Sequence, residues 1–89
     1  MEKSHDLVPS KVFLKDLKKL PPDVKPKVMQ ALLALKKDPY SGTNIRKLTS
    51  VGIGVFRLRI GDWRLRYDVV GQEVRLHIIR RRKEVYRSR

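Results

Sequence analysis

An alternation of apolar and polar side chains between residues 56 and 79 constrains the fold of this 89-residue chain more than any other feature. Two dipeptides that begin with glycine, Gly61-Asp62 and Gly71-Gln72, interrupt the alternation. Such alternation is typical of a half-buried β-strand, and such a dipeptide is typical of a two-residue hairpin turn. The segment therefore predicts three consecutive antiparallel strands with one apolar and one polar face.

The length of each turn also fixes which residues lie opposite one another. On the apolar face, a turn at Gly61-Asp62 predicts the pairs Ile60 with Trp63, Leu58 with Leu65 and Phe56 with Tyr67. On the polar face it predicts Arg59 opposite Arg64 and Arg57 opposite Arg66. A turn at Gly71-Gln72 predicts Val69 with Val74, Tyr67 with Leu76, Leu65 with Ile78, Arg75 with Asp68 and His77 with Arg66.

Two helices are expected before the strands. Ser10 is a suitable N-cap for a first helix, which Pro21-Pro22 ends, and Asp23 is expected to cap a second, which ends at Lys37 before Pro39. Apolar residues recur at helical spacing in both, namely Phe13, Leu14, Leu17 and Leu20 in the first and Val24, Val28, Leu32 and Leu35 in the second. The short connection favours an antiparallel helix hairpin that covers the apolar face of the sheet.

The rest of the chain gives weaker signals. Residues 40–54 contain three glycines and little periodicity, so we expect a loop in which Leu48 points inward. A short extended stretch from His5 to Val8 is expected to add an outer strand. The predicted fold is α+β, in the order β-α-α-β-β-β on a small, mainly antiparallel twisted sheet, and residues 1–89 form one domain.

The composition of the chain limits the classes of partner that we expect. The formal net charge is +13 and there is no cysteine. The charge favours a polyanion, with nucleic acid as the first expectation and a membrane surface or an acidic protein as alternatives. No apolar run approaches the roughly 18 residues that span a bilayer. We expect a cytoplasmic protein without disulfides, cofactor or metal, and without a membrane partner.

The basic residues are sorted along the chain. Ten of the eleven lysines precede Leu48, and ten of the eleven arginines follow Val55. Arginine presents a planar fork of donors that matches phosphate oxygens, and four arginines of the first hairpin share one face. Like charges that lie opposite each other destabilise a sheet, so a binding role is favoured over long side chains that merely spread into water.

Further candidates follow the third strand. Arg80, Arg81, Arg82 and Lys83 are expected to approach the same basic face. Tyr86 is open to three interpretations, a core residue, a platform for an unstacked base, or a proton carrier. His77 is either a packing residue or a substrate contact. The predicted pair of Asp68 and Arg75 balances its own charge, which favours a structural role.

The chemistry that remains is narrow. The sequence has no paired carboxylates, no glycine-rich phosphate loop and no nucleophile elbow. RNA cleavage suits such a chain, because the ribose 2′-hydroxyl supplies the nucleophile and arginines can stabilise the charge that develops on phosphate.

The chain resembles a known family on specific segments. The segment VFRLRIGDWRLRYDVVGQEVRLHIIRRRKEVYR looks like the C-terminal half of RelE-type toxins of the RelE/ParE superfamily, and KKDP with the following IRKL matches the family layout. The most specific pieces are Arg57-Leu58-Arg59, the adjoining Ile60-Gly61-Asp62-Trp63-Arg64, and Glu84-Val85-Tyr86.

The resemblance implies a metal-independent endoribonuclease, an mRNA interferase, that enters the A site of the 30S ribosomal subunit and cleaves mRNA. It also implies a cognate RelB-like antitoxin. The catalytic positions implied are Arg57, Arg59, Arg64, Arg82 (or Arg81) and Tyr86. From their predicted place on or near the basic face, the expected RNA-binding residues are Arg66, His77, Arg80, Arg81 and Lys83. Arginine is a poor base, so its presence where some relatives have lysine, at 57 and 59, either leaves more of the proton transfer to Tyr86 or means that this residue only stabilises charge.

Other functions are compatible with the same features. A ParE-like toxin directed at DNA gyrase is the nearest alternative, although that branch generally lacks this arginine and tyrosine set. A basic module that binds RNA or ribosomes without catalysis is the second, and a partner protein that has lost toxicity is the third.

Overall fold

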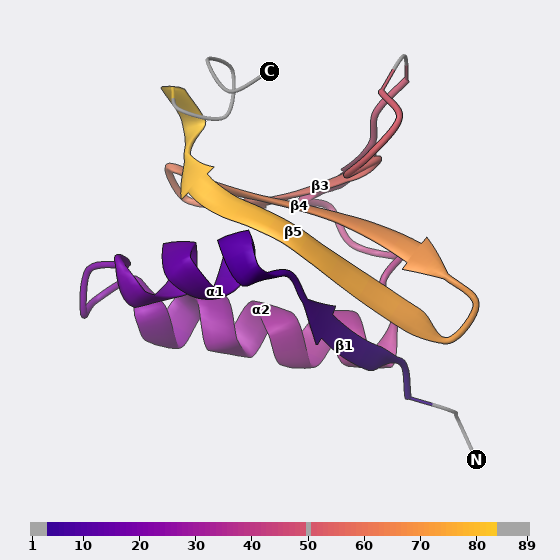
Figure 1. The fold of residues 1–89 in the computed structure, drawn as a ribbon, viewed down its shortest axis with the longest axis horizontal. Helices are drawn as coiled ribbons and strands as arrows, with labels where there is room; N and C mark the ends of the chain where they lie inside the picture. Colours follow the sequence, from indigo (N-terminus) through magenta and orange to yellow (C-terminus); the bar gives the residue numbers. More distant parts are fainter. Residues whose placement is uncertain (1–3, 50, 84–89) are drawn as a thin grey trace.

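The alternating segment forms the centre of a single five-stranded sheet. The computed structural model describes residues 4–49 and 51–83. Its elements are β1 (Asp6–Pro9), α1 (Lys11–Lys18), α2 (Lys25–Lys37), β2 (Ile45–Lys47), β3 (Phe56–Ile60), β4 (Trp63–Val70) and β5 (Glu73–Arg81). The strands lie in the order β1-β5-β4-β3-β2, and both helices cover the same side of the sheet (Figure 1). This confirms the predicted α+β layers.

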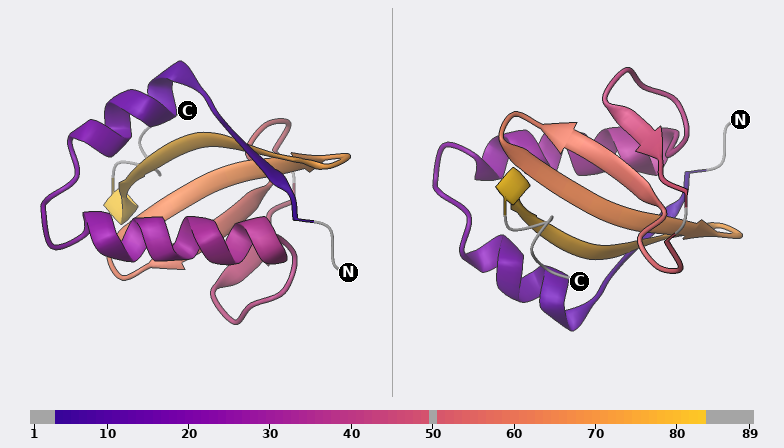
Figure 2. Two further views of the ribbon diagram at one scale, coloured as in Figure 1. Left: turned by 90° about the horizontal axis from the view of Figure 1, so that it is seen from below. Right: turned by 90° about the horizontal axis from the view of Figure 1, so that it is seen from above.

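The helices run in roughly opposite directions and diverge from their connecting turn (Figure 2). Neither α1 nor α2 lies over the side of the sheet that faces away from them, called the outer face below. The segment between β2 and β3 and the end of β5 both project from this outer face (Figure 1). No helix within residues 4–49 and 51–83 is long and apolar enough to cross a membrane.

The first hairpin has the predicted register. Every predicted pair between β3 and β4 is present, from Ile60 with Trp63 to Phe56 with Tyr67. Gly61 and Gly71 both have φ of 60°, the left-handed conformation that two-residue hairpin turns require and glycine adopts without strain.

The second hairpin departs from the prediction halfway along. Val69 lies opposite Val74 and Tyr67 opposite Leu76, as predicted, but the register shifts between Arg66 and Tyr67. Leu65 therefore lies opposite Ile79 rather than Ile78, and Arg66 lies opposite Ile78 rather than His77. The reason is a β-bulge, since Leu76 and Ile79 are both buried and an odd spacing reaches the same face only with an extra residue.

Of the two outer strands, one was predicted and the other was not. β1 confirms the expected N-terminal strand and pairs with β5 in parallel. β2 corrects the prediction that residues 40–54 form a loop, because Ile45–Lys47 pairs antiparallel with β3. Three residues are too few to show a periodicity, so only their pairing with β3 makes them a strand.

One of the two predicted helix caps is present and the other is absent. The Ser10 Oγ accepts from the Phe13 amide at 2.9 Å and donates to the His77 carbonyl at 2.9 Å, which joins the start of α1 to β5. Asp23 does not cap α2, whose N-cap is Val24 without a side-chain bond. The Val24 and Lys25 amides already donate to the Pro21 carbonyl, so the first-turn donors that Asp23 would serve are engaged.

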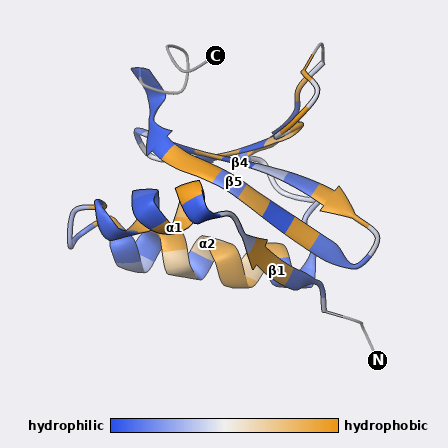
Figure 3. Ribbon diagram, viewed as in Figure 1, coloured by the Kyte–Doolittle hydropathy of each residue, from blue (hydrophilic) through white to orange (hydrophobic). Residues whose placement is uncertain are grey.

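The core lies between the helices and the sheet. Its buried residues are Phe13, Leu20, Val28, Leu32, Leu35, Leu58, Leu65, Tyr67, Val74, Leu76 and Ile79. Leu17, Val24 and Trp63 pack at its margin, whereas Leu14, predicted to belong to the stripe of α1, is exposed. Figure 3 shows the corresponding alternation of hydropathy along β5 and the hydrophilic end of that strand.

The edge of β5 that β1 leaves open is closed by α1. The Asp16 Oδ2 accepts from the Ile79 amide and from the Arg80 Nε, both at 3.2 Å. A carboxylate on a helix thus takes the place of a strand carbonyl, which keeps the edge of β5 from presenting a free amide there.

Candidate nucleic-acid interface

The outer face gathers cations from three neighbouring strands. Arg57 lies opposite Arg66, and Arg59 lies opposite Arg64, as predicted. Arg46 on β2 lies opposite Arg57 on its other side. Arg46 is not among the predicted site residues, because the sequence of residues 40–54 predicts a loop. Arg57 is therefore the centre of a row of three arginines.

The β3 arginines are the least engaged of the set. The Arg57 Nε is buried and has no hydrogen-bond partner in the described part of the chain. Arg59 is exposed, and its Nη2 donates to the Asn44 Oδ1 at 3.4 Å. No backbone carbonyl within residues 4–49 and 51–83 holds either guanidinium group, so both keep donors for an anion.

The β4 arginines bind the backbone instead. The Arg64 Nη1 donates to the carbonyls of Gly61 at 2.7 Å and Trp63 at 3.0 Å, and this side chain is only 7% exposed. The Arg66 Nε donates to the Gly54 carbonyl at 2.6 Å, and its Nη2 to the Ile53 carbonyl at 3.2 Å. Arg64 thus supports the hairpin turn, and Arg66 supports the segment before β3.

Asp68 also holds the segment before β3, through its carboxylate. Its carboxylate accepts from the amides of Gly54 at 2.9 Å and Val55 at 2.8 Å, and it contacts the His77 Nε2 at 2.7 Å. The predicted ion pair with Arg75 is wrong, although the two residues lie opposite each other, because Arg75 pairs with Glu73 at 3.1 Å.

These contacts change the acidity of Asp68. Burial by itself would raise its pKa, but the amides of Val55 and Gly54 and the contact with His77 stabilise the carboxylate, and the net pKa lies below the ordinary value. The folded protein therefore holds Asp68 ionised more firmly than the unfolded chain does.

A pH dependence of stability follows from this shift. With a folded pKa below the unfolded value of about 3.9, the ionised carboxylate stabilises the fold above about pH 4, and this stability is lost as the pH falls through the folded pKa. We expect Asp68→Asn to cost about 1–3 kcal/mol at about pH 7 and less at about pH 2 in urea unfolding. Asp23→Asn, which removes an exposed carboxyl, is the control. A difference between wild type and Asp68→Asn that is equal at both pH values would contradict the assignment.

Gly54 is required by both conformation and space. Its φ is 66°, and a Cβ there would lie 3.2 Å from the Arg66 Cβ. We expect Gly54→Ala to lower the free energy of unfolding by about 1–3 kcal/mol. Gly52→Ala is the matched control, because a Cβ at Gly52 meets nothing within 4 Å. Thermal unfolding of the two variants measures the difference, and equal losses would rule out this role for Gly54.

The basic residues Arg80, Arg81, Arg82 and Lys83, at and after the end of β5, have different surroundings. Arg80 is held by Asp16, and the Arg81 guanidinium lies 5.3 Å from the centroid of the Trp63 ring. Arg82 and Lys83 are exposed, and the Arg82 amide donates to the Asp62 carbonyl at 2.8 Å. The predicted Tyr86 lies outside the described residues.

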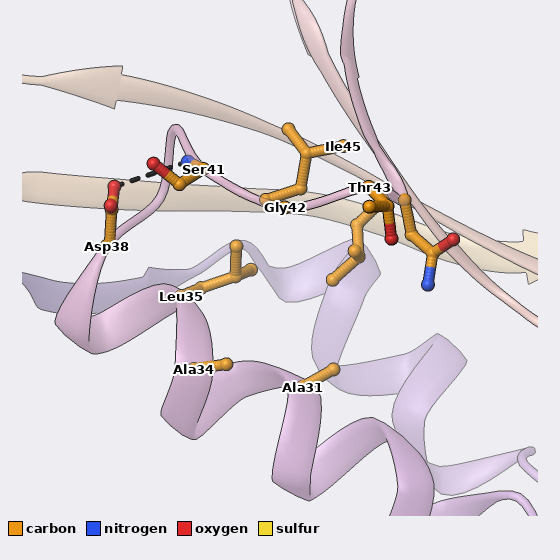
Figure 4. A pocket seen from close by; sticks show the side chains of 10 residues that line it. Ala31, Ala34, Leu35, Asp38, Ser41, Gly42, Thr43 and Ile45 are labelled. Atoms are coloured by element: carbon orange, nitrogen blue, oxygen red, sulfur yellow. Dashed lines mark hydrogen bonds between the residues drawn. The ribbon is translucent and has the colours of Figure 1, made fainter.

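A pocket lies on the side of the sheet that the helices cover. It has a volume of about 290 Å³ and is lined by Ala31, Ala34, Leu35, Asp38, Ser41, Gly42, Thr43, Asn44, Ile45 and Leu58 (Figure 4). A backbone hydrogen bond from Tyr40, with further ones from Ser41, lowers the pKa of Asp38 at its rim. This pocket is largely apolar with a carboxylate beside it, so it does not share the chemistry of the outer face.

Comparison with known proteins decides the family. A family model described as the ParE toxin of the type II toxin–antitoxin system parDE matches residues 7–86. The chain belongs to the ParE toxin family. This confirms the resemblance to the RelE/ParE superfamily. A comparison with curated proteins finds no match.

Solved structures show that this ParE family member has the fold of RelE toxins. The RelE–RelB complex of Methanococcus jannaschii matches with a TM-score of 0.74 at 20% identity, over 90% of this chain and 95% of that one. A mutant of the E. coli toxin RelE in the free state matches with a TM-score of 0.71 at 24% identity, over 94% and 92%. YafQ from E. coli matches with a TM-score of 0.66 at 22% identity, over 92% and 98%.

Proposed function

We propose that this protein is a toxin that enters the ribosomal A site and cleaves mRNA by attack of a ribose 2′-hydroxyl on the adjacent phosphate. The observation that carries this proposal is the pair Arg57 and Arg59, two arginines of one strand with donors available on the face opposite α1 and α2. Their neighbours Arg64 and Arg66 hold the flanking turns in place.

The step needs little from the protein beyond charge and position. The 2′-oxygen forms a bond to phosphorus while the bond from phosphorus to the 5′-oxygen breaks, which leaves a 2′,3′-cyclic phosphate and a 5′-hydroxyl. Negative charge accumulates on the non-bridging oxygens, where guanidinium donors stabilise the transition state more than the ground state. Arg57 and Arg59 are assigned this role.

The proton from the 2′-hydroxyl needs an acceptor, and arginine is a poor one. We assign Tyr86 to this transfer and Arg82 to charge near the leaving 5′-oxygen, from the family resemblance. Arg64, in contrast, acts through the turn that it supports, because a side chain only 7% exposed has little surface to offer RNA. Arg66 and His77 hold the outer-face segment, and from there Arg66 contributes charge to RNA binding while His77 is assigned to contact RNA.

We further propose a cytoplasmic toxin with an antitoxin partner. Toxins of this fold have been crystallised with RelB, as in the complexes from Methanococcus jannaschii and E. coli. A net charge of +13 calls for an acidic partner, and an acidic RelB-like antitoxin would complement the outer face.

The test is a translation reaction reconstituted with purified ribosomes, in which the 5′ ends of mRNA fragments are mapped after the protein is added. Cuts within the codon in the A site, which require ribosomes and carry 5′-hydroxyl ends, are the expected result. Intact mRNA under conditions where the protein is folded would contradict the proposal.

Inhibition of DNA gyrase is the second candidate, and the match to the ParE toxin model favours it. A gyrase supercoiling assay with the same preparation separates the two. Inhibited supercoiling with intact mRNA would replace the first proposal by the second. Binding to ribosomes without either effect would indicate a module that recognises RNA without catalysis.

A further inference from the structure

The segment of residues 51–55, called the 51–55 loop below, presents apolar side chains on the outer face. Ile53 is 69% exposed and Val51 is 38% exposed. The loop projects from the side of the sheet opposite the helices, next to the strands that carry the arginines (Figure 1). The loop thus brings two exposed β-branched side chains to a cationic surface.

The loop is fixed in this position by charged groups. Arg66 donates to the carbonyls of Ile53 and Gly54, and Asp68 accepts from the amides of Gly54 and Val55. Below them, the Leu48 amide donates to the Val55 carbonyl at 2.7 Å and closes the base of the loop. Four charge-assisted bonds and a left-handed glycine thus hold the apolar end away from the core.

The charged residues around the 51–55 loop indicate which class of partner it would bind. The loop leads directly into β3, so the apolar pair lies next to a row formed by Arg46, Arg57 and Arg66. Cations around a small apolar contact suit a single-stranded nucleic acid, in which phosphates meet guanidinium groups and an unstacked base offers an apolar face. A membrane surface would need a larger apolar area than two side chains supply.

We propose that Val51 and Ile53 form an apolar contact for an unstacked nucleobase of RNA whose phosphates lie over Arg46, Arg57 and Arg59. Arg66 and Asp68 position this contact through the loop backbone. The proposal rests on the RNA-binding part of the proposed function and adds the place where a base, rather than a phosphate, is bound.

The experiment measures binding of the full-length protein to a short single-stranded RNA that contains 2-aminopurine, whose fluorescence reports the environment of one base. We expect Ile53→Ser to weaken binding about fivefold, the equivalent of one apolar contact of about 1 kcal/mol, and to abolish the 2-aminopurine change. The dependence of affinity on salt should stay as in wild type, because no charge is removed. Arg57→Ala should instead lower the salt slope by about 0.7.

Leu33→Ser is the matched control, since Leu33 is an aliphatic residue 62% exposed on α2, on the other side of the sheet. Val51→Ser is a second variant at the proposed contact and should act in the same direction as Ile53→Ser. Circular dichroism checks that each variant is folded. All three are expected to fold, because the three positions are exposed.

The outcomes are distinct. If Ile53→Ser and Val51→Ser bind RNA and change 2-aminopurine fluorescence as wild type does while Arg57→Ala binds more weakly, the base contact is wrong and the proposed function stands. If the wild type shows no affinity for RNA at low salt, both fail. If Ile53→Ser loses affinity for anionic phospholipid vesicles but not for RNA, the loop contacts membrane and the inference is overturned.

Discussion

Replacement of Arg57 by alanine is expected to slow ribosome-dependent mRNA cleavage about 100-fold or more. Loss of one preorganised donor to a developing oxyanion costs rates of about 10²–10³ in other enzymes, and Arg57 is the central arginine of the outer-face row. Single-turnover cleavage of mRNA on programmed ribosomes measures the effect on the chemical step.

Two controls separate catalysis from general charge and from folding. Arg75→Ala removes one positive charge from an exposed ion pair with Glu73 and should leave cleavage nearly unchanged. The melting temperature of Arg57→Ala should not fall well below that of wild type, because the substitution breaks no hydrogen bond of the Nε within residues 4–49 and 51–83. A normal cleavage rate in Arg57→Ala would remove Arg57 from the site.

The largest effect on stability is expected for Tyr67→Ala, at about 3–5 kcal/mol. Tyr67 is fully buried, stacks on Phe56 with ring centroids 5.4 Å apart, and donates its hydroxyl to the Pro39 carbonyl at 2.6 Å. Burial raises the pKa of Tyr67, so the hydroxyl remains a donor throughout the neutral range. Chemical denaturation at about pH 7 measures the loss.

Two further variants divide this effect into its parts. Tyr67→Phe keeps the ring and leaves the Pro39 carbonyl without its donor, which should cost about 1–3 kcal/mol. Tyr40→Ala removes an aromatic residue that is 57% exposed and should cost clearly less than Tyr67→Ala. Equal losses for Tyr40→Ala and Tyr67→Ala would show that the burial of Tyr67 and its hydrogen bond to Pro39 add little to stability.

The arginines of β3 and those of β4 have different roles in this structure. β3 offers guanidinium groups with donors to spare, whereas Arg64 and Arg66 on β4 bind backbone carbonyls of the segments that border the face. Such a division explains how like charges tolerate cross-strand proximity, because carbonyl oxygens offset part of the repulsion on one strand of each pair. It also predicts that substitutions of Arg64 and Arg66 mainly lower stability, whereas substitutions of Arg57 and Arg59 mainly lower RNA binding and cleavage.

The sequence determined the central sheet and the basic face by itself. Alternation and turn length fix side-chain direction and register locally, so Arg57 opposite Arg66 and Arg59 opposite Arg64 followed from the positions of Gly61 and Asp62. The stripe of α2 and the Ser10 cap followed in the same way, since helical spacing and first-turn donors are also local properties.

Only the tertiary structure decided which of these cations are engaged. The bulge in β5 arises because Ile79 must share the core with Leu76, and it brings His77 to Asp68 rather than opposite Arg66. Strand β2, the support of the 51–55 loop, and the contact of Asp16 with Arg80 join residues far apart in the chain. Periodicity describes neighbours along a segment, whereas these contacts depend on how segments pack, and that is why the sequence alone could place the arginines on a face but not assign their partners.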